Sequence, residues 1–335
     1  MCIIAILYKT ARDAPILLAA NREERFARPS LPPKIQSGSP RVICGVDREA
    51  GGTWLGVNQY GTVATVMNRR KTLVPAEPRS RGLLCRELLN FRRAEDAAHY
   101  AADQLATGSY SGANYVCLDA EYAAVVYGGD RIEVVQLQPG LHTLSSTGEL
   151  NDPNDPRQGF VRRSLTLHRL DSSVLFLAVA SRTFSRQHEI SGGRGMVLTG
   201  TEYGTVSSSL LSLPKRLQQA ILQHAPGPPS EIPYEDLSAL LRQVLSTERS
   251  RQRAKAQRKE AAQKKAEEEL VDQDDVDEVE SDSASPPDDA AEEASKATAK
   301  AAPKKKKKTP RAATKTAHKP ADEVRKKPSK IRKKK

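Results

Sequence analysis

The sequence predicts an α+β layered sandwich over residues 1–247, followed by a charged C-terminal tail. Short apolar runs come in blocks, and segments with helical spacing lie between the blocks instead of alternating with single strands. The composition changes after residue 246, where aromatic residues stop. The first 247 residues are long enough to bury a substantial core.

The predicted strands begin at the N-terminus. Cys2 to Tyr8 and Pro15 to Ala20 are continuous apolar runs joined by a short polar loop, which is the pattern of two buried strands. Further strands are predicted at Val42 to Val46, Thr53 to Val57, Thr62 to Met67, Asn114 to Leu118, Tyr122 to Tyr127, Glu133 to Leu137, Met196 to Thr199 and Thr205 to Leu211. Helices are predicted over Arg81 to Leu105, in two pieces, Gln158 to Leu170 and Tyr234 to Leu245.

The C-terminal tail divides into three segments by charge. Residues 248–270 contain helix formers without an apolar face, which predicts a solvated helix or linker. Residues 271–299 are acidic, and residues 300–335 carry 17 Lys and Arg against two acids, an excess of positive charge larger than the net +12 of the whole chain. The acidic and Lys-rich segments have too little apolar surface to offset their ordering entropy, and we expect both to be disordered.

The Lys-rich segment 300–335 suggests a nucleic-acid partner. Its Lys/Ala/Pro composition resembles linker-histone tails, and seventeen basic residues would neutralise many phosphates without reading sequence. The alternative is a solubilising tail that pairs electrostatically with the acidic segment. No apolar stretch approaches the ~20 residues of a membrane span, and no signal peptide is evident, so the sequence predicts a cytoplasmic protein.

The cysteines do not indicate a disulfide framework or a zinc site. Cys2, Cys44, Cys85 and Cys117 form no CxxC pair and have no His at ligand spacing. Cys2 differs from the others because removal of Met1 would leave its α-amine free. An α-amine titrates near ~7.7–8.0 and a thiol near ~8.5, so this one residue can supply both a nucleophile and its base. The alternative is a buried thiol in a first strand.

A polar tetrapeptide follows the second apolar run. In a hairpin, the end of that run returns to the neighbourhood of Cys2, which would bring Asn21, Arg22, Glu23 and Glu24 close to it. Arg22 could bind a substrate carboxylate or hold a carboxylate partner bidentately, and the Asn or a Glu of this tetrapeptide could orient the α-amine. A surface turn with Arg–Glu pairing is the alternative.

The segment GGTWLGVNQYGTVATVMN predicts two strands joined by a tight turn. Asn58 ends the first strand and is a candidate substrate-binding residue. Asn68 stands at the exit of the second strand, where it is either a donor to a developing oxyanion or a turn residue.

Taken together, Cys2, the Asn21–Glu24 tetrapeptide followed by RFARP, and GGTWLGVN resemble the NRDE family, which includes the transport and Golgi organisation protein 2 proteins. The resemblance extends through SRG (80–82), YSGANYVCLD (110–119) and YGTVSSSLL (203–211). The family is similar in turn to N-terminal-nucleophile (Ntn) hydrolases of the bile-salt hydrolase and penicillin V acylase branch. The resemblance therefore implies a four-layer αββα sandwich.

The resemblance also implies a hydrolase that acts on an amide, ester or thioester and needs no cofactor. Cys2 would be nucleophile and base, Glu24 a nearby acid and Asn68 an oxyanion donor. Ser146 stands where the family usually has Asn and is a second candidate substrate contact; Val206 stands where relatives often have Arg. The alternative implied by the resemblance is a non-catalytic protein in Golgi organisation or in lipid or haem handling, with Cys2 and His142 as candidate haem-iron ligands.

Overall fold

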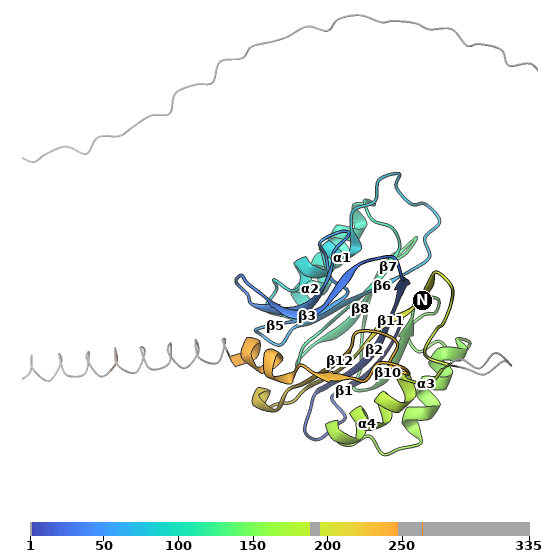
Figure 1. The fold of residues 1–335 in the computed structure, drawn as a ribbon. Coiled ribbons are helices and arrows are strands. Elements are labelled where there is room, and N and C mark those ends of the chain that lie inside the picture. The colour runs from blue at the N-terminus through green and yellow to red at the C-terminus, as the bar shows by residue number, and fades with distance from the viewer. Residues whose placement is uncertain (1, 188–194, 247–262, 264–335) are drawn as a thin grey trace, which may run out of the picture. The chain divides into compact units, whose positions relative to one another are not determined.

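The computed structural model describes residues 2–187, 195–246 and 263, all within the unit Met1–Gln273. The predictions for segments 248–270, 271–299 and 300–335 lie outside these residues, apart from residue 263. The described chain folds into two antiparallel sheets with helices on their outer faces (Figure 1).

The first sheet carries both N-terminal strands at its centre. Its strand order is β10-β1-β2-β11-β12-β13, and every neighbouring pair is antiparallel. The strands are β10 (Gly140–Ser145), β1 (Ile3–Tyr8), β2 (Ile16–Arg25), β11 (Tyr203–Leu213), β12 (Ile221–Ala225) and β13 (Glu235–Asp236).

The second sheet is a seven-stranded meander in chain order. Its strands are β3 (Ser30–Gln36), β4 (Val42–Asp47), β5 (Leu55–Asn58), β6 (Val63–Asn68), β7 (Ala113–Leu118), β8 (Ala123–Gly128) and β9 (Ile132–Gln136). The sequence did not predict β3 because it contains Pro32 and Pro33. β3 is an edge strand, where proline is tolerated, and its register with β4 shifts between Leu31 and Lys34, so neither proline is paired with β4.

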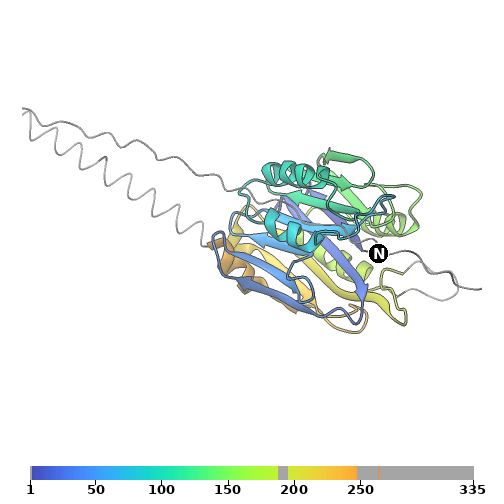
Figure 2. The same cartoon turned by 90° about the horizontal axis from the view of Figure 1, so that it is seen from above.

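Helices cover the outer face of each sheet (Figure 2). The second sheet packs against α1 (Arg81–Leu88) and α2 (Ala94–Ala106), and the first against α3 (Pro156–Thr166) and α4 (Ser173–Phe184). A short 3-10 helix, Leu217–Gln219, precedes β12. Residues 238–246 are also helical, and Leu241, Val244 and Leu245 join the core between the sheets. The architecture is the expected αββα sandwich.

Alternation along the strands creates separate cores. In β1, Ile4 and Ile6 face the second sheet, whereas Ile3, Ala5 and Leu7 face α3 and α4. Both faces of the strand are therefore buried, which is why it reads as one continuous apolar run. Among the described residues, no helix is long and apolar enough to cross a membrane.

Candidate functional site

Cys2 lies immediately before β1, between the ends of β2 and β10. Its side chain lies on the same face of the sheet as that of Ile4. It packs there against the core between the two sheets. The residue is partly exposed, whereas Cys44, Cys85 and Cys117 are buried. Cys2 is therefore the one cysteine of this chain with partial access to solvent.

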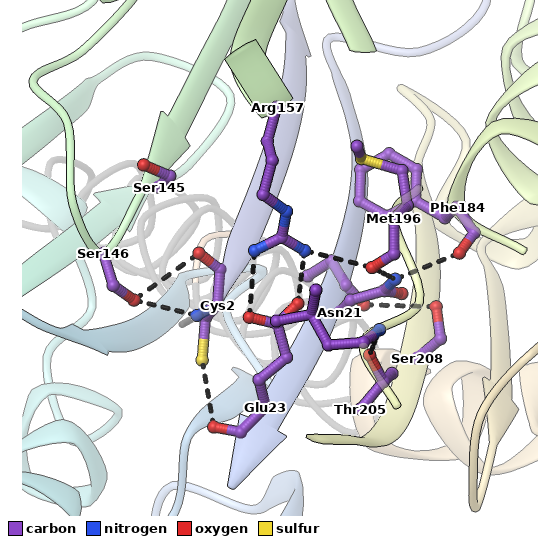
Figure 3. A network of polar contacts seen from close by, with 12 residues as sticks. Cys2, Asn21, Glu23, Ser145, Ser146, Arg157, Phe184, Met196, Thr205 and Ser208 are labelled. Carbon is purple, nitrogen blue, oxygen red and sulfur yellow. Dashed lines mark hydrogen bonds and ion pairs between the residues drawn. The ribbon is translucent and has the colours of Figure 1, made fainter. Parts of the chain in front are cut away.

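Ser146 holds the backbone of Cys2 (Figure 3). The Cys2 nitrogen donates to Ser146 Oγ at 2.8 Å, and the Ser146 nitrogen donates to the Cys2 carbonyl at 3.1 Å. The Cys2 thiol is directed at the Glu23 carbonyl oxygen, 3.9 Å away. The sequence suggested Ser146 as a substrate contact, and the structure places its hydroxyl at the Cys2 nitrogen, the atom that removal of Met1 would make an α-amine.

The tetrapeptide Asn21–Glu24 is not a turn but the last part of strand β2. Successive strand residues point to opposite faces, so the four polar groups do not converge. Asn21 Nδ2 donates to the carbonyl oxygens of Phe184 and Met196, at 3.0 and 3.1 Å, on the helix side of the sheet. The Asn21 amide thus ties β2 to α4 and does not reach the side of the sheet that Cys2 faces.

Glu23 also points toward the helices, where Arg157 at the start of α3 meets it. Arg157 binds both carboxylate oxygens of Glu23, and the Glu23 side chain is completely buried (Figure 3). Arg157 also donates to the Met196 carbonyl oxygen at 3.0 Å, and the Tyr203 hydroxyl donates to the Glu23 carbonyl oxygen at 2.8 Å. The pair fixes the strand segment whose carbonyl faces the Cys2 thiol. No sequence pattern linked Arg157 to this site.

Arg22 points to the same side as Cys2. Its guanidinium stacks 4.1 Å above the Trp54 ring centroid and donates to Ser30 Oγ at 3.1 Å. The Trp54 ring in turn lies against Gly45, where a Cβ would come within 2.4 Å of the ring. Burial lowers the pKa of Arg22, although a guanidinium stays charged at any pH at which the protein is folded.

A cleft of ≈ 370 Å³ brings four of the predicted catalytic residues together. Cys2, Arg22, Glu24 and Asn68 line this cleft, and Asn68 is exposed at the end of β6. Its walls also carry Arg28, Asp47, Glu49, Arg79, Arg81 and Trp54. The arrangement places a thiol, an amide donor and several charged groups around one opening.

The electrostatics at Cys2 favour the protonated thiol. Burial, followed by the negative charge of Glu23, raises the pKa of Cys2 above its ordinary value. Thiolate is therefore scarce at neutral pH, and nucleophilic attack requires a base beside the thiol. The α-amine of a processed Cys2 would be that base.

His142 lies too far along the sheet to share an iron atom with Cys2. It pairs with Ile6 of β1, four residues from Cys2, which corresponds to roughly 13 Å along a strand. Its ring nitrogens contact the Gln138 carbonyl oxygen and the Asn151 amide. The described residues contain no cluster of three or more His, Cys, Asp or Glu side chains suited to a metal ion. The Cys2–His142 haem pair therefore does not fit this structure.

Asn58 is a buried structural residue of the β5–β6 turn and not part of the cleft. Its Oδ1 accepts from the backbone nitrogens of Tyr60 and Thr62 at 2.9 and 3.0 Å, and its Nδ2 donates to the carbonyl oxygens of Leu89 and Phe91 at 3.0 and 2.7 Å. The GVNQYG motif that suggested a substrate contact therefore encodes a turn tied to α1.

We expect Asn58→Ala to lower the free energy of unfolding by about 2 kcal/mol, because buried backbone donors and acceptors lose their partners. Urea denaturation measures this loss. Asn90→Ala, an exposed asparagine nearby, is the control and should change stability little. Equal stability of Asn58→Ala and the unmodified chain would contradict the assignment.

The layers and the position of Cys2 define the architecture around the cleft. Two antiparallel sheets face each other between helical layers, and a cysteine at position 2 stands at the head of a central strand. Residues 1–166 match the family described as Transport and Golgi organisation 2.

Two curated relatives agree with the family match. The chain is 34% identical over 141 residues to the Transport and Golgi organization protein 2 homolog of Bos taurus and 31% identical over 140 residues to that of Homo sapiens. In both cases the match covers 39% of this chain and 50% of the relative. The chain thus spans about half the length of the curated relatives it matches.

Two of the solved structures that this chain resembles are described as hydrolytic enzymes. The Caenorhabditis elegans ortholog of N-acylethanolamine-hydrolyzing acid amidase has a TM-score of 0.41 and 10% identity, covering 63% of this chain and 92% of that chain. A mutant conjugated bile acid hydrolase from Clostridium perfringens has a TM-score of 0.42 and 12% identity, covering 71% and 93%. The αββα architecture follows from the sheet order and the helix packing of this chain itself.

Proposed function

We propose that this protein is a cytoplasmic Ntn-type hydrolase whose processed Cys2 attacks an amide, ester or thioester carbonyl. The observation that supports this most is the hydrogen bond from the Cys2 nitrogen to Ser146, at the mouth of a cleft also lined by Arg22, Glu24 and Asn68. This contact would orient the α-amine released by removal of Met1.

The reaction would proceed in two stages. The α-amine accepts the thiol proton as Cys2 Sγ bonds to the carbonyl carbon, and the developing oxyanion accepts a hydrogen bond from the Asn68 amide. The bond to the leaving group then breaks, and the protonated α-amine returns the proton to that group. Water, deprotonated by the same amine, then attacks the thioester carbonyl; the C–S bond breaks, the acid leaves, and the amine returns its proton to the Cys2 thiolate.

Intact-mass analysis combined with acylation tests this proposal. We expect purified protein to lack Met1, and a β-lactone to acylate Cys2 when the thiolate opens the ring. Cys2→Ala should abolish the acylation, whereas Cys44→Ser should not, because Cys44 is 1% exposed. Retention of Met1, or equal labelling of the Cys2→Ala protein, would refute the nucleophile.

A second candidate function rests on the names of the relatives. Both are described as transport and Golgi organization proteins, which supports a non-catalytic role in trafficking. Cells in which Cys2→Ala restores Golgi organisation as fully as the unmodified chain would favour this role. Restoration only by chains with an intact Cys2 would favour the hydrolase.

A further inference from the structure

A small cavity opens behind Cys2, between the two sheets. It has a volume of ≈ 20 Å³, and its lining includes Cys2, Ala20, Arg22, Trp54, Ser207 and Ser209. Its volume is only slightly above the ~10–15 Å³ that one water molecule needs. The cavity therefore suits a compact group and not a long chain.

Ser207 is a buried hydroxyl without a hydrogen-bond partner in the part of the chain that the structure describes. The residue is 5% exposed, and its Oγ is buried. A buried polar atom left unsatisfied is unfavourable, so a ligand atom that hydrogen-bonds to Ser207 would be stabilised there. Ser209, in contrast, already pairs with His224 Nδ1 at 2.9 Å.

Strand register places Ser207 beside Arg22. A bulge between Thr205 and Ser207 sets Ser207 directly opposite Arg22, and continuing the β1–β2 register by one residue places Cys2 on the other side of Arg22. Opposite residues have Cβ atoms about 4.5–5.5 Å apart. Arg22 thus lies between the thiol and the unsatisfied hydroxyl on one face of the sheet.

Arg22 is the one charged side chain lining this cavity. It is 7% exposed, and among the described residues it forms no ion pair with a carboxylate within 4 Å. Burial and the nearby Arg22 charge lower the pKa of His224 to about 4, so the Ser209–His224 pair is neutral at pH 7. The cavity therefore presents a single positive charge beside a free hydroxyl.

We infer that the cavity binds the carboxylate of a short dicarboxylic acyl group, with Arg22 and Ser207 as its ligands, while Cys2 attacks the other carbonyl. This inference rests on the proposed function and specifies its substrate as a half-amide, half-ester or half-thioester of a small dicarboxylic acid. The neighbouring strands that carry Cys2 and Arg22 lie ~4.8 Å apart, as in any sheet. This separation fits a ligand with only a few carbons between its carboxylate and the carbonyl that Cys2 attacks.

A matched pair of electrophiles tests the inference. A succinyl chloromethyl ketone ends in a carboxylate, and a butyryl chloromethyl ketone carries a methyl group in its place. In both, a Cys2 S–C bond forms, the C–Cl bond breaks, chloride leaves and the thiol proton passes to the α-amine. Intact mass followed over time measures the rate of alkylation at Cys2.

We expect the succinyl probe to alkylate Cys2 about tenfold faster than the butyryl probe. This factor corresponds to the gain from one hydrogen bond to a charged group. Ser207→Ala should reduce this preference severalfold without destabilising the protein, since the hydroxyl has no partner to lose. Ser212→Ala is the control. Ser212 also lies on β11 and has a buried Oγ without a hydrogen-bond partner among the described residues, but its side chain faces away from the cavity. The Ser212→Ala protein should keep the full preference for the succinyl probe.

Equal rates for the two probes, or a preference unchanged in Ser207→Ala, would overturn the inference. A Cys2→Ala protein separates this result from failure of the proposed function. Calorimetry with succinamate and butyramide should show binding of succinamate alone. If succinamate binds selectively but neither probe alkylates the unmodified chain, the nucleophile is rejected and the carboxylate site is retained. If the two amides bind equally, or neither binds, the carboxylate site is rejected.

Discussion

A residue that remains in front of Cys2 is expected to slow acylation of Cys2 by about 10²–10⁴-fold, the usual contribution of a positioned acid–base group. Inserting Glu between Met1 and Cys2 provides such a chain, because a bulky second residue blocks removal of Met1. The thiol is retained, but its nitrogen becomes an amide and can no longer accept a proton. Stopped-flow or mass-resolved acylation by a β-lactone measures the difference.

The pH dependence should distinguish the two forms of the chain. In the processed protein, acylation should rise as the α-amine loses its proton, near ~7.7–8.0. In the extended protein, the rate should rise only as the thiol itself ionises, and burial and Glu23 raise the pKa of Cys2. The difference is therefore largest near neutral pH and shrinks in alkali.

A cleavable extension supplies the control for this experiment. A protease that removes the extension and leaves Cys2 as the first residue should restore both the rate and the pH profile. An extended chain that reacts as fast as the processed one at pH 7 would show that the α-amine is not the base.

The β1–β2 hairpin was predictable from the sequence, whereas the directions of its polar side chains were not. Continuous apolar runs identified both strands, and the hairpin correctly returned residues 21–24 to Cys2. The charges suggested that the strand ended at Ala20, yet β2 continues to Arg25. Once this segment is a strand, alternation assigns Arg22 to the Cys2 side and Glu23 to the helices.

Other elements escaped prediction for identifiable physical reasons. α4 is so apolar that its run SVLFLAVA shows no polar face from which a helical period could be recognised. Arg157 meets Glu23 across 134 residues of chain, and nothing local to either residue signals the pair. Ser207 was hidden because its alignment with Arg22 depends on a bulge that shifts the register by one residue.

Arg157→Leu is expected to destabilise the fold by about 3–5 kcal/mol, because it removes the guanidinium that binds both oxygens of the buried Glu23 carboxylate. The Glu23 side chain is 0% exposed and that of Arg157 is 14% exposed, so water cannot replace the lost contact. The urea midpoint and its slope give the change in the free energy of unfolding. Adding Glu23→Gln to Arg157→Leu should recover part of the loss, since the buried negative charge is then removed.

Arg12→Leu is the matched control for this prediction. Arg12 pairs with Asp171 at 2.7 Å, but its side chain is 72% exposed, so its removal should cost less than about 1 kcal/mol. A similar small loss for Arg157→Leu would mean that the Glu23–Arg157 pair does not hold β2 against α3. In that case contacts such as that of Tyr203 and the β2–β11 pairing would position the Glu23 carbonyl beside the Cys2 thiol.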